Sequence, residues 1–242
     1  MKLPPAWNLP AAIKHRLGQK SAGKQRVMRA DGHLLLVLHQ APQIHQTDRI
    51  GVFIWRRPNG SWEHSNGGVG FQVVMKHLRT YDDAEALLVQ QYNQAQTAAD
   101  YFRLLEAIAP LRLATQNLHT TLQAAREGIP SDRDIIDARD WAYELERSLD
   151  LLQEHTKNAL DFRLAQRAEE QTQLSLQAVK TGHRLNVLAA IFFPLTAVSC
   201  VFGMNLTSGL EGTSPATFWV TLGLAIALGF WVQRWSIAGS WQ

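Results

Sequence analysis

Cysteine is nearly absent from this chain of 242 residues, and Cys200 is the only one. A single cysteine cannot close an internal disulfide, and it excludes the paired-cysteine spacing of structural zinc sites. The N-terminus also lacks the apolar core of a secretory signal, since its first ten residues hold Lys2 and three prolines. We therefore expect a protein with neither a redox framework nor a cleaved leader.

A large excess of positive or negative charge is absent as well. The formal net charge is only +3, which is too small to indicate nucleic-acid binding, and basic residues alternate with acids along most of the chain. No nucleophile elbow or phosphate-binding glycine loop is present. The sequence therefore predicts neither an enzyme nor a tightly bound cofactor.

Two stretches near the C-terminus lack charge altogether. One is residues 185–204, LNVLAAIFFPLTAVSCVFGM, and the other is 216–232, ATFWVTLGLAIALGFWV. Each is close to the roughly 20 apolar residues that cross a bilayer core. We expect a transmembrane hairpin over 185–242, with spans at about 185–204 and 216–234 and a short outer loop at 205–215. The alternative is two buried helices of a soluble core.

The basic residues give an orientation. Lys180, His183 and Arg184 precede the first span and Arg234 follows the second, whereas Glu211 is the only charge in the loop between them. By the positive-inside rule both termini are cytoplasmic and the loop faces outward. We thus expect a multi-pass protein of the plasma (inner) membrane.

The region before the spans is polar. Residues 1–31 are expected to be mostly irregular, with a short helix near 11–17. A small α+β cytoplasmic domain is predicted at 32–130, with three strands at 33–39, 50–56 and 61–64, followed by helical pattern over 71–128. Alanines and leucines, with Gln91 and Phe102, recur at helical spacing between Ala84 and Ala109 and are expected to form one stripe of that pattern.

A long stalk helix is predicted at 131–184, because no proline occurs between Ser131 and Pro194. Apolar or small residues recur in it at steps of three and four, the rhythm of a coiled coil, at positions 138, 142, 145, 149, 152, 156 and 159, and Arg163 continues the spacing. With the first span this makes a helix of roughly 70 residues, about 100 Å long. Such a helix needs the preceding helix, other subunits, or both to cover its stripe.

A motif stands at the outer end of the first span. Pro194-Leu195-Thr196 is followed by Gly203-Met204-Asn205, a short loop and a final span. This arrangement resembles the CorA magnesium-transporter family over about 179–234 and the helix leading in. The resemblance implies an α-helical membrane protein with two spans per subunit, assembled as a homopentamer around one axial pore.

The resemblance also implies roles for the motif. Asn205 would form a ring of amide oxygens at the pore entrance and hold the metal ion through its hydration shell, because Mg²⁺ gives up its water reluctantly. Gly203 would permit close approach, and Met204 would support the loop by packing. The transported ion is expected to be Mg²⁺, with Co²⁺, Ni²⁺ or Zn²⁺ as relatives. The bland interpretation of the three residues is a helix C-cap.

A pore-lining stripe follows from the same resemblance. At steps of three and four it comprises Cys200, Thr196, Phe193, Ala189, Leu185 and Gly182. The family implies a polar ring at Thr196 and a hydrophobic gate at Leu185. Helix packing is the competing interpretation of each residue.

The chain also departs from the family. Its loop is almost uncharged, so cation attraction there rests on Glu211, and the usual large α/β/α cytoplasmic domain is not visible. No regulatory metal site is carried over, and the acids that would otherwise be candidates are expected to be solvated helix starts: Asp82, Asp83, Asp132, Asp134 and Asp137. These departures keep open a second function, a non-transporting oligomeric membrane-anchored coiled-coil scaffold derived from the same family. A coupled zinc transporter is disfavoured because neither span contains an acid.

Overall fold

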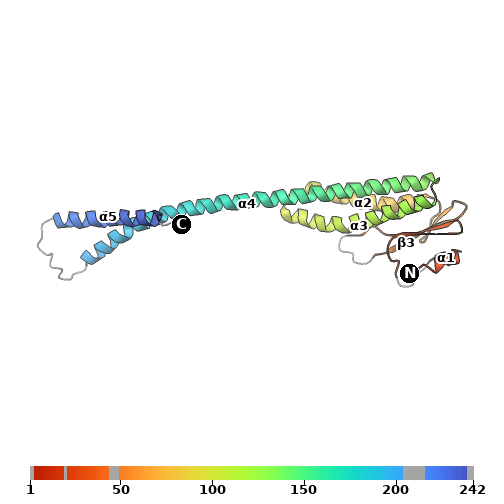
Figure 1. Ribbon diagram of the computed structural model, residues 1–242, viewed down its shortest axis with the longest axis horizontal. Coiled ribbons are helices and arrows are strands. Elements are labelled where there is room, and N and C mark those ends of the chain that lie inside the picture. Colours follow the sequence, from red (N-terminus) through yellow and green to blue (C-terminus); the bar gives the residue numbers. More distant parts are fainter. Residues whose placement is uncertain (1–2, 19–20, 44–48, 204–215, 239–242) are drawn as a thin grey trace. The chain divides into compact units, whose positions relative to one another are not determined.

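The computed structural model describes residues 3–18, 21–43, 49–203 and 216–238, except for the side chains at 202, 232, 233 and 235–238. It divides into two units, residues 1–165 and 166–242, with the boundary inside a helix. The elements are α1 (Ala11–Lys14), β1 (Arg26–Ala30), β2 (His33–His39), β3 (Gly51–Arg56), β4 (Trp62–His64), α2 (Gln72–Gln94), α3 (Ala98–Gly128), α4 (Arg133–Gly203) and α5 (Ala216–Ala238) (Figure 1).

The first unit contains an antiparallel sheet with the strand order β1-β2-β3-β4. Strands β2, β3 and β4 lie where three strands were expected. The expectation that residues 1–31 are irregular was wrong for β1, so the sheet has four strands in the described residues. Asp31 and Gly32 join β1 to β2 with φ of 52° and 77°, the left-handed conformation that a two-residue hairpin turn requires.

Both faces of this sheet are buried. Leu35 and Val37 of β2 point into a cluster with Trp7 and Ile13 of the N-terminal segment, whereas Leu36 points into the larger cluster on the helical side. Burial on both faces explains why β2 is a continuous apolar run rather than an alternating one. The N-terminal segment therefore acts as a cover for one face of the sheet.

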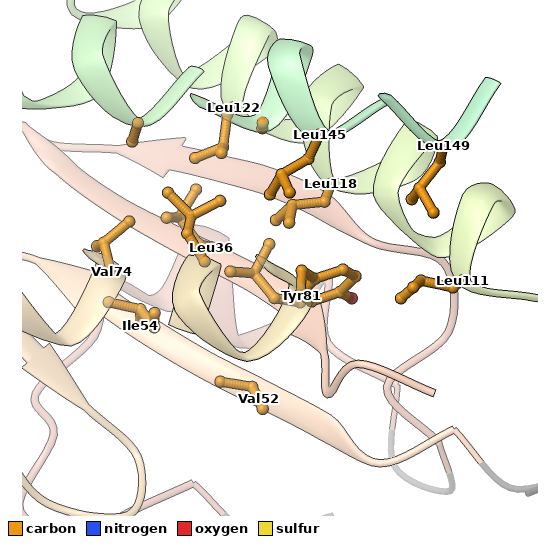
Figure 2. Packing of buried hydrophobic residues seen from close by; sticks show 14 of the residues in the cluster. Leu36, Val52, Ile54, Val74, Tyr81, Leu111, Leu118, Leu122, Leu145 and Leu149 are labelled. Atoms are coloured by element: carbon orange, nitrogen blue, oxygen red, sulfur yellow. The ribbon is translucent and has the colours of Figure 1, made fainter. Parts of the chain in front are cut away.

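The helical face holds the main core. Figure 2 shows Leu36 and Ile54 of the sheet meeting Leu118 and Leu122 of α3 and Leu145 of α4 (Figure 2). These five side chains are between 0% and 4% exposed. Burying each such side chain contributes about 1.5–3 kcal/mol, so this cluster fixes α2, α3 and the start of α4 on the sheet.

The helical pattern over 71–128 forms two helices. Thr97 ends the break between α2 and α3, because its side chain accepts from the Asp100 N–H while the Asp100 carboxylate accepts from the Thr97 N–H. The stripe expected between Ala84 and Ala109 crosses this break and does not form one buried face, so that expectation was wrong. Leu87 and Phe102 are 60% and 56% exposed.

The stripe of α4 is buried by the chain itself in its first half. Its members from Ala138 to Thr156 are at most 6% exposed and pack in the main core. Asp132, just before α4, forms an ion pair with Arg56 at 2.7 Å, although it was expected to be a solvated helix start. The unit thus begins before residue 32 and includes the first turns of the predicted stalk. The outcome is a small α+β domain followed by a long helix.

Candidate functional site

The second unit consists of the remainder of α4 and the helix α5. In the described residues, α4 is the one helix that is long and apolar enough to cross a membrane, judged by length and composition. The apolar part of α5 that qualifies is shorter and covers Ala216–Trp231. No charged residue occurs in α4 between Leu185 and Gly203. The sequence-predicted site lies at the end of this uncharged stretch.

Gly203 is the last residue of α4 and is exposed. Met204, Asn205 and Glu211 lie outside the described residues. The structure therefore places the helix that leads into the Gly-Met-Asn motif, while the geometry of the motif itself stays a prediction.

The predicted pore stripe lies along one exposed face of α4. Leu185 and Phe193 are 61% and 73% exposed, and Thr196 and Cys200 are exposed as well. The two smallest members of the stripe, Gly182 and Ala189, are half-buried. All six positions fall within a narrow arc of the helix surface at about 100° per residue.

A different face of α4 is partly covered. Its half-buried apolar residues follow helical spacing and are Val187, Ala190, Ile191, Pro194, Leu195 and Val198. At about 100° per residue, the centre of this face lies about 170° around the helix from the centre of the stripe. The predicted pore stripe and the covered face are therefore nearly opposite.

Helix α5 packs against this covered face. Among the side chains of α5 that the structure describes, Ala225 and Gly229 are the buried ones, and they are four residues apart, which places them on one side of the helix. A methyl group built on Gly229 would lie 3.2 Å from the Ala190 carbonyl oxygen and 3.2 Å from the Ile191 Cα. Small residues at this spacing let two membrane helices approach closely. This pair was not predicted from the sequence, although the Ala-x-x-x-Gly pattern of Ala225 and Gly229 favours close helix packing.

Pro194 explains one feature of this contact. Proline has no N–H, so the carbonyl of Ala190, four residues earlier, lacks its usual partner in the helix. That carbonyl is the atom that Gly229 approaches. The absence of a side chain at position 229 thus lets the backbone of α5 lie against the carbonyl that Pro194 leaves free.

Thr196 presents an acceptor on the exposed face. Its hydroxyl donates to the Phe192 carbonyl at 2.8 Å, so its proton is engaged within the helix. The lone pairs of the oxygen remain free to accept a hydrogen bond. Water bound to a cation points its hydrogens outward, so an exposed oxygen that accepts hydrogen bonds suits the hydration shell of a cation.

Between residues 162 and 179, α4 carries apolar side chains that the described chain does not cover. The large ones are 50% to 67% exposed and are Phe162, Leu164, Leu174, Leu176 and Val179. At about 100° per residue they lie around much of the helix rather than on one face.

Metal-binding side chains do not gather elsewhere in the described residues. No group of three or more His, Cys, Asp or Glu side chains is arranged there to hold a metal ion. His33 accepts a hydrogen bond from the Trp55 indole at 3.0 Å, and His39 bonds the Gly23 carbonyl at 2.8 Å. Both histidines therefore have structural partners.

Comparison with known structures gives the fold. The cytoplasmic domain of ZntB from Vibrio parahaemolyticus matches with a TM-score of 0.54 and 10% identity, covering 67% of this chain and 80% of that one. The full-length CmaX protein matches with a TM-score of 0.46 and 16% identity, covering 89% and 78%. The CorA magnesium transporter of Methanocaldococcus jannaschii gives 0.46 and 14%, covering 93% and 83%.

Among curated proteins, no sequence matches the chain. The family of CorA-like Mg²⁺ transporter proteins matches residues 79–235. This range includes α3, α4 and α5 as far as residue 235. The match spans more than half of the chain and includes the Gly-Met-Asn motif. The chain therefore belongs to the CorA-like Mg²⁺ transporter protein family.

Proposed function

We propose that the chain is a subunit of a homopentameric channel that carries Mg²⁺ across the plasma membrane. Family membership supports divalent-cation transport in general. The observation that carries the finer proposal is the orientation of α4, whose predicted pore stripe lies nearly opposite the face that packs against α5. Five copies could then turn their stripes toward a common axis while each α5 stays on the outside.

In this arrangement both α4 and α5 span the membrane. The short apolar helix at Ala216–Trp231 supports a second span, since interfacial residues at its ends extend the apolar part. The basic residues Lys180 and Arg184 before the first span and Arg234 after the second favour cytoplasmic termini. The segment 205–215 would then face outward.

The stripe would line the path of a hydrated ion through the pore. A ring of Asn205 amide oxygens would hold the hydration shell at the entrance, and a ring of Thr196 oxygens would accept from the same waters below it. Neutral oxygens suit Mg²⁺ because they bind its water without demanding dehydration. Leu185 would close the pore by dewetting, and Phe193 would form a second constriction.

Oligomerisation would also bury part of the large apolar side chains that are exposed on α4 between Phe162 and Val179. The subunit's own helices bury the stripe of α4 as far as Thr156, so the helix beyond that residue is available to other subunits. The mass of the detergent-solubilised protein should be five times that of one chain. A monomeric mass would contradict the axial pore.

The test is ion flux into proteoliposomes under an inside-negative potential, read with a Mg²⁺-sensitive dye. The wild-type protein should give saturable Mg²⁺ entry, and Asn205→Ala should reduce it at least tenfold or remove its preference for Mg²⁺. Asn158→Ala, at an exposed position of α4 outside the span, is the matched control and should leave entry unchanged. Wild-type liposomes without divalent-cation flux under any gradient would contradict the proposal and favour the non-transporting scaffold.

A further inference from the structure

A cavity of about 1030 Å³ lies in the first unit, and no described residue of the predicted pore stripe lines it. It is bounded by the segment after β2, the loop after β4, one side of α2 and part of α3. Its volume matches the upper end of small-molecule sites in proteins, which are 300–1,000 Å³. Nothing in the proposed transport function uses it.

The cavity has a polar end. His64, Lys76 and His77 line it there, together with the loop at Gly67 and Gly68. Lys76 forms no ion pair with another described residue at 4.0 Å or less. Its charge is close enough to His64 to contribute to the lowered pKa of that imidazole, although burial of His64 is the larger cause. This end therefore has a cation without a paired anion.

Two neutral donors or acceptors accompany that cation. The His64 Nδ1 accepts from the Asn66 N–H at 2.9 Å, so its Nε2 carries the proton and can donate. His77 is 7% exposed, and its Nε2 is buried without a hydrogen-bond partner within the described chain. A buried polar atom left unpaired is destabilising, and a ligand oxygen that reached it would remove that cost.

The other end of the cavity is apolar. Leu87 and Leu88 of α2 face Ala107 and Leu111 of α3 along it. Leu87 is 60% exposed, which is unusual for a leucine that lines a hollow unless something covers it. From Lys76 to Leu87 the lining follows α2 for eleven residues, or about 16 Å at 1.5 Å per residue. An extended chain of about eight carbon atoms spans more than half of that length, and one of about twelve spans nearly all of it.

We propose that this cavity binds an amphiphilic monocarboxylate, with its carboxylate at Lys76, His64 and His77 and its hydrocarbon chain along Leu87 and Leu88. Charge complementarity selects an anionic head group, since Asp83 is the only acid among the described residues that line the cavity and it lies about two turns along α2 from Lys76. The neutral histidines donate without adding charge, so a single negative charge is matched by the single lysine. The tail covers the exposed leucine.

The probe is 8,8,8-trifluorooctanoate, observed by ¹⁹F NMR with the full-length protein in nanodiscs of neutral phosphatidylcholine. Empty nanodiscs measure partition into lipid. The wild-type protein should show saturable binding of one molecule per chain above that background. The corresponding trifluoro-octanol, which lacks the carboxylate, should bind at least fivefold more weakly.

Two substitutions at exposed positions test the two ends without disturbing the core. Lys76→Met should weaken octanoate binding at least fivefold, and Leu87→Glu should weaken it at least tenfold. The matched controls are Lys157→Met and Leu113→Glu, both at exposed positions that do not line the cavity, and both should bind like the wild type. Signal no greater than that of empty nanodiscs, equal binding of the alcohol, or binding indifferent to Lys76→Met and Leu87→Glu would overturn the proposal.

Discussion

Gly229 of α5 lies against the carbonyl oxygen of Ala190 in α4, where a methyl group would come within 3.2 Å. The atoms that it would meet belong to the backbone and cannot rotate away. Pro194 leaves that same carbonyl without its helical donor. The contact therefore joins Pro194 in α4 to Gly229 in α5, and it sets which face of α4 is left exposed.

Substituting Gly229 should separate the two helices. Gly229→Leu places a branched side chain against the backbone of α4, so we expect loss of the assembled protein in membranes or a marked fall in its thermal stability. Gly223→Leu is the matched control, because a methyl group built at that glycine meets nothing within 4 Å. Size-exclusion chromatography in detergent measures the outcome. Equal assembly of the two variants would contradict the close approach.

More of α4 than of the sheet could be predicted from the sequence. Absence of charge and of helix breakers indicates the long helix α4 directly, because these are local properties of the sequence. The orientation of α4 needed the contact at Gly229, which depends on tertiary packing. The motif residues Met204 and Asn205 were recognised by resemblance and remain untested by the structure.

In the sheet, the missed strand β1 has a clear physical reason. Arg26 and Arg29 interrupt its apolar pattern, since the strand lies at the sheet edge and pairs on one side only. The turn Asp31-Gly32 was a stronger signal than the strand itself, because Asp-Gly favours a two-residue hairpin. Asp132 was misjudged because its partner, Arg56, is distant in sequence.

The core of the first unit should respond to cavity formation. Leu118 of α3 is fully buried at 0% exposed, whereas Leu113 on the same helix is 50% exposed. Leu118→Ala should lower the free energy of unfolding by about 2–5 kcal/mol, and Leu113→Ala by much less. Chemical unfolding followed by circular dichroism compares them. Similar losses in both variants would mean that Leu118 is not in a close-packed core.

Acid should destabilise the first unit through His77. Burial, with smaller contributions from His64 and His39, lowers the pKa of His77 to about 4 from 6.5. Between those values the unfolded chain binds the proton and the folded chain does not, so the free energy of unfolding falls as the pH drops from about 6.5 to about 4. The full loss is about 3 kcal/mol for such a shift.

Thermal unfolding between pH 7.5 and pH 4.5 measures this dependence. His77→Phe should flatten it in part, since His39 and His64 also have lowered pKa values and keep their share. His155→Phe replaces an exposed histidine and should keep the wild-type slope. A slope that His77→Phe leaves unchanged would show that His77 is not buried as a neutral group.

Cys200 gives the most direct test of the ion path, because it is the only cysteine in the chain and is exposed on the predicted pore stripe of α4. A positively charged methanethiosulfonate reagent added outside proteoliposomes should modify Cys200 and reduce Mg²⁺ flux at least fivefold, and a thiol reductant should restore it. Cys200→Ser should be insensitive, as should Cys200→Ser combined with Val198→Cys, whose cysteine lies on the covered face. The account predicts this block; complete modification of Cys200, verified by mass spectrometry, with Mg²⁺ flux unchanged would contradict it.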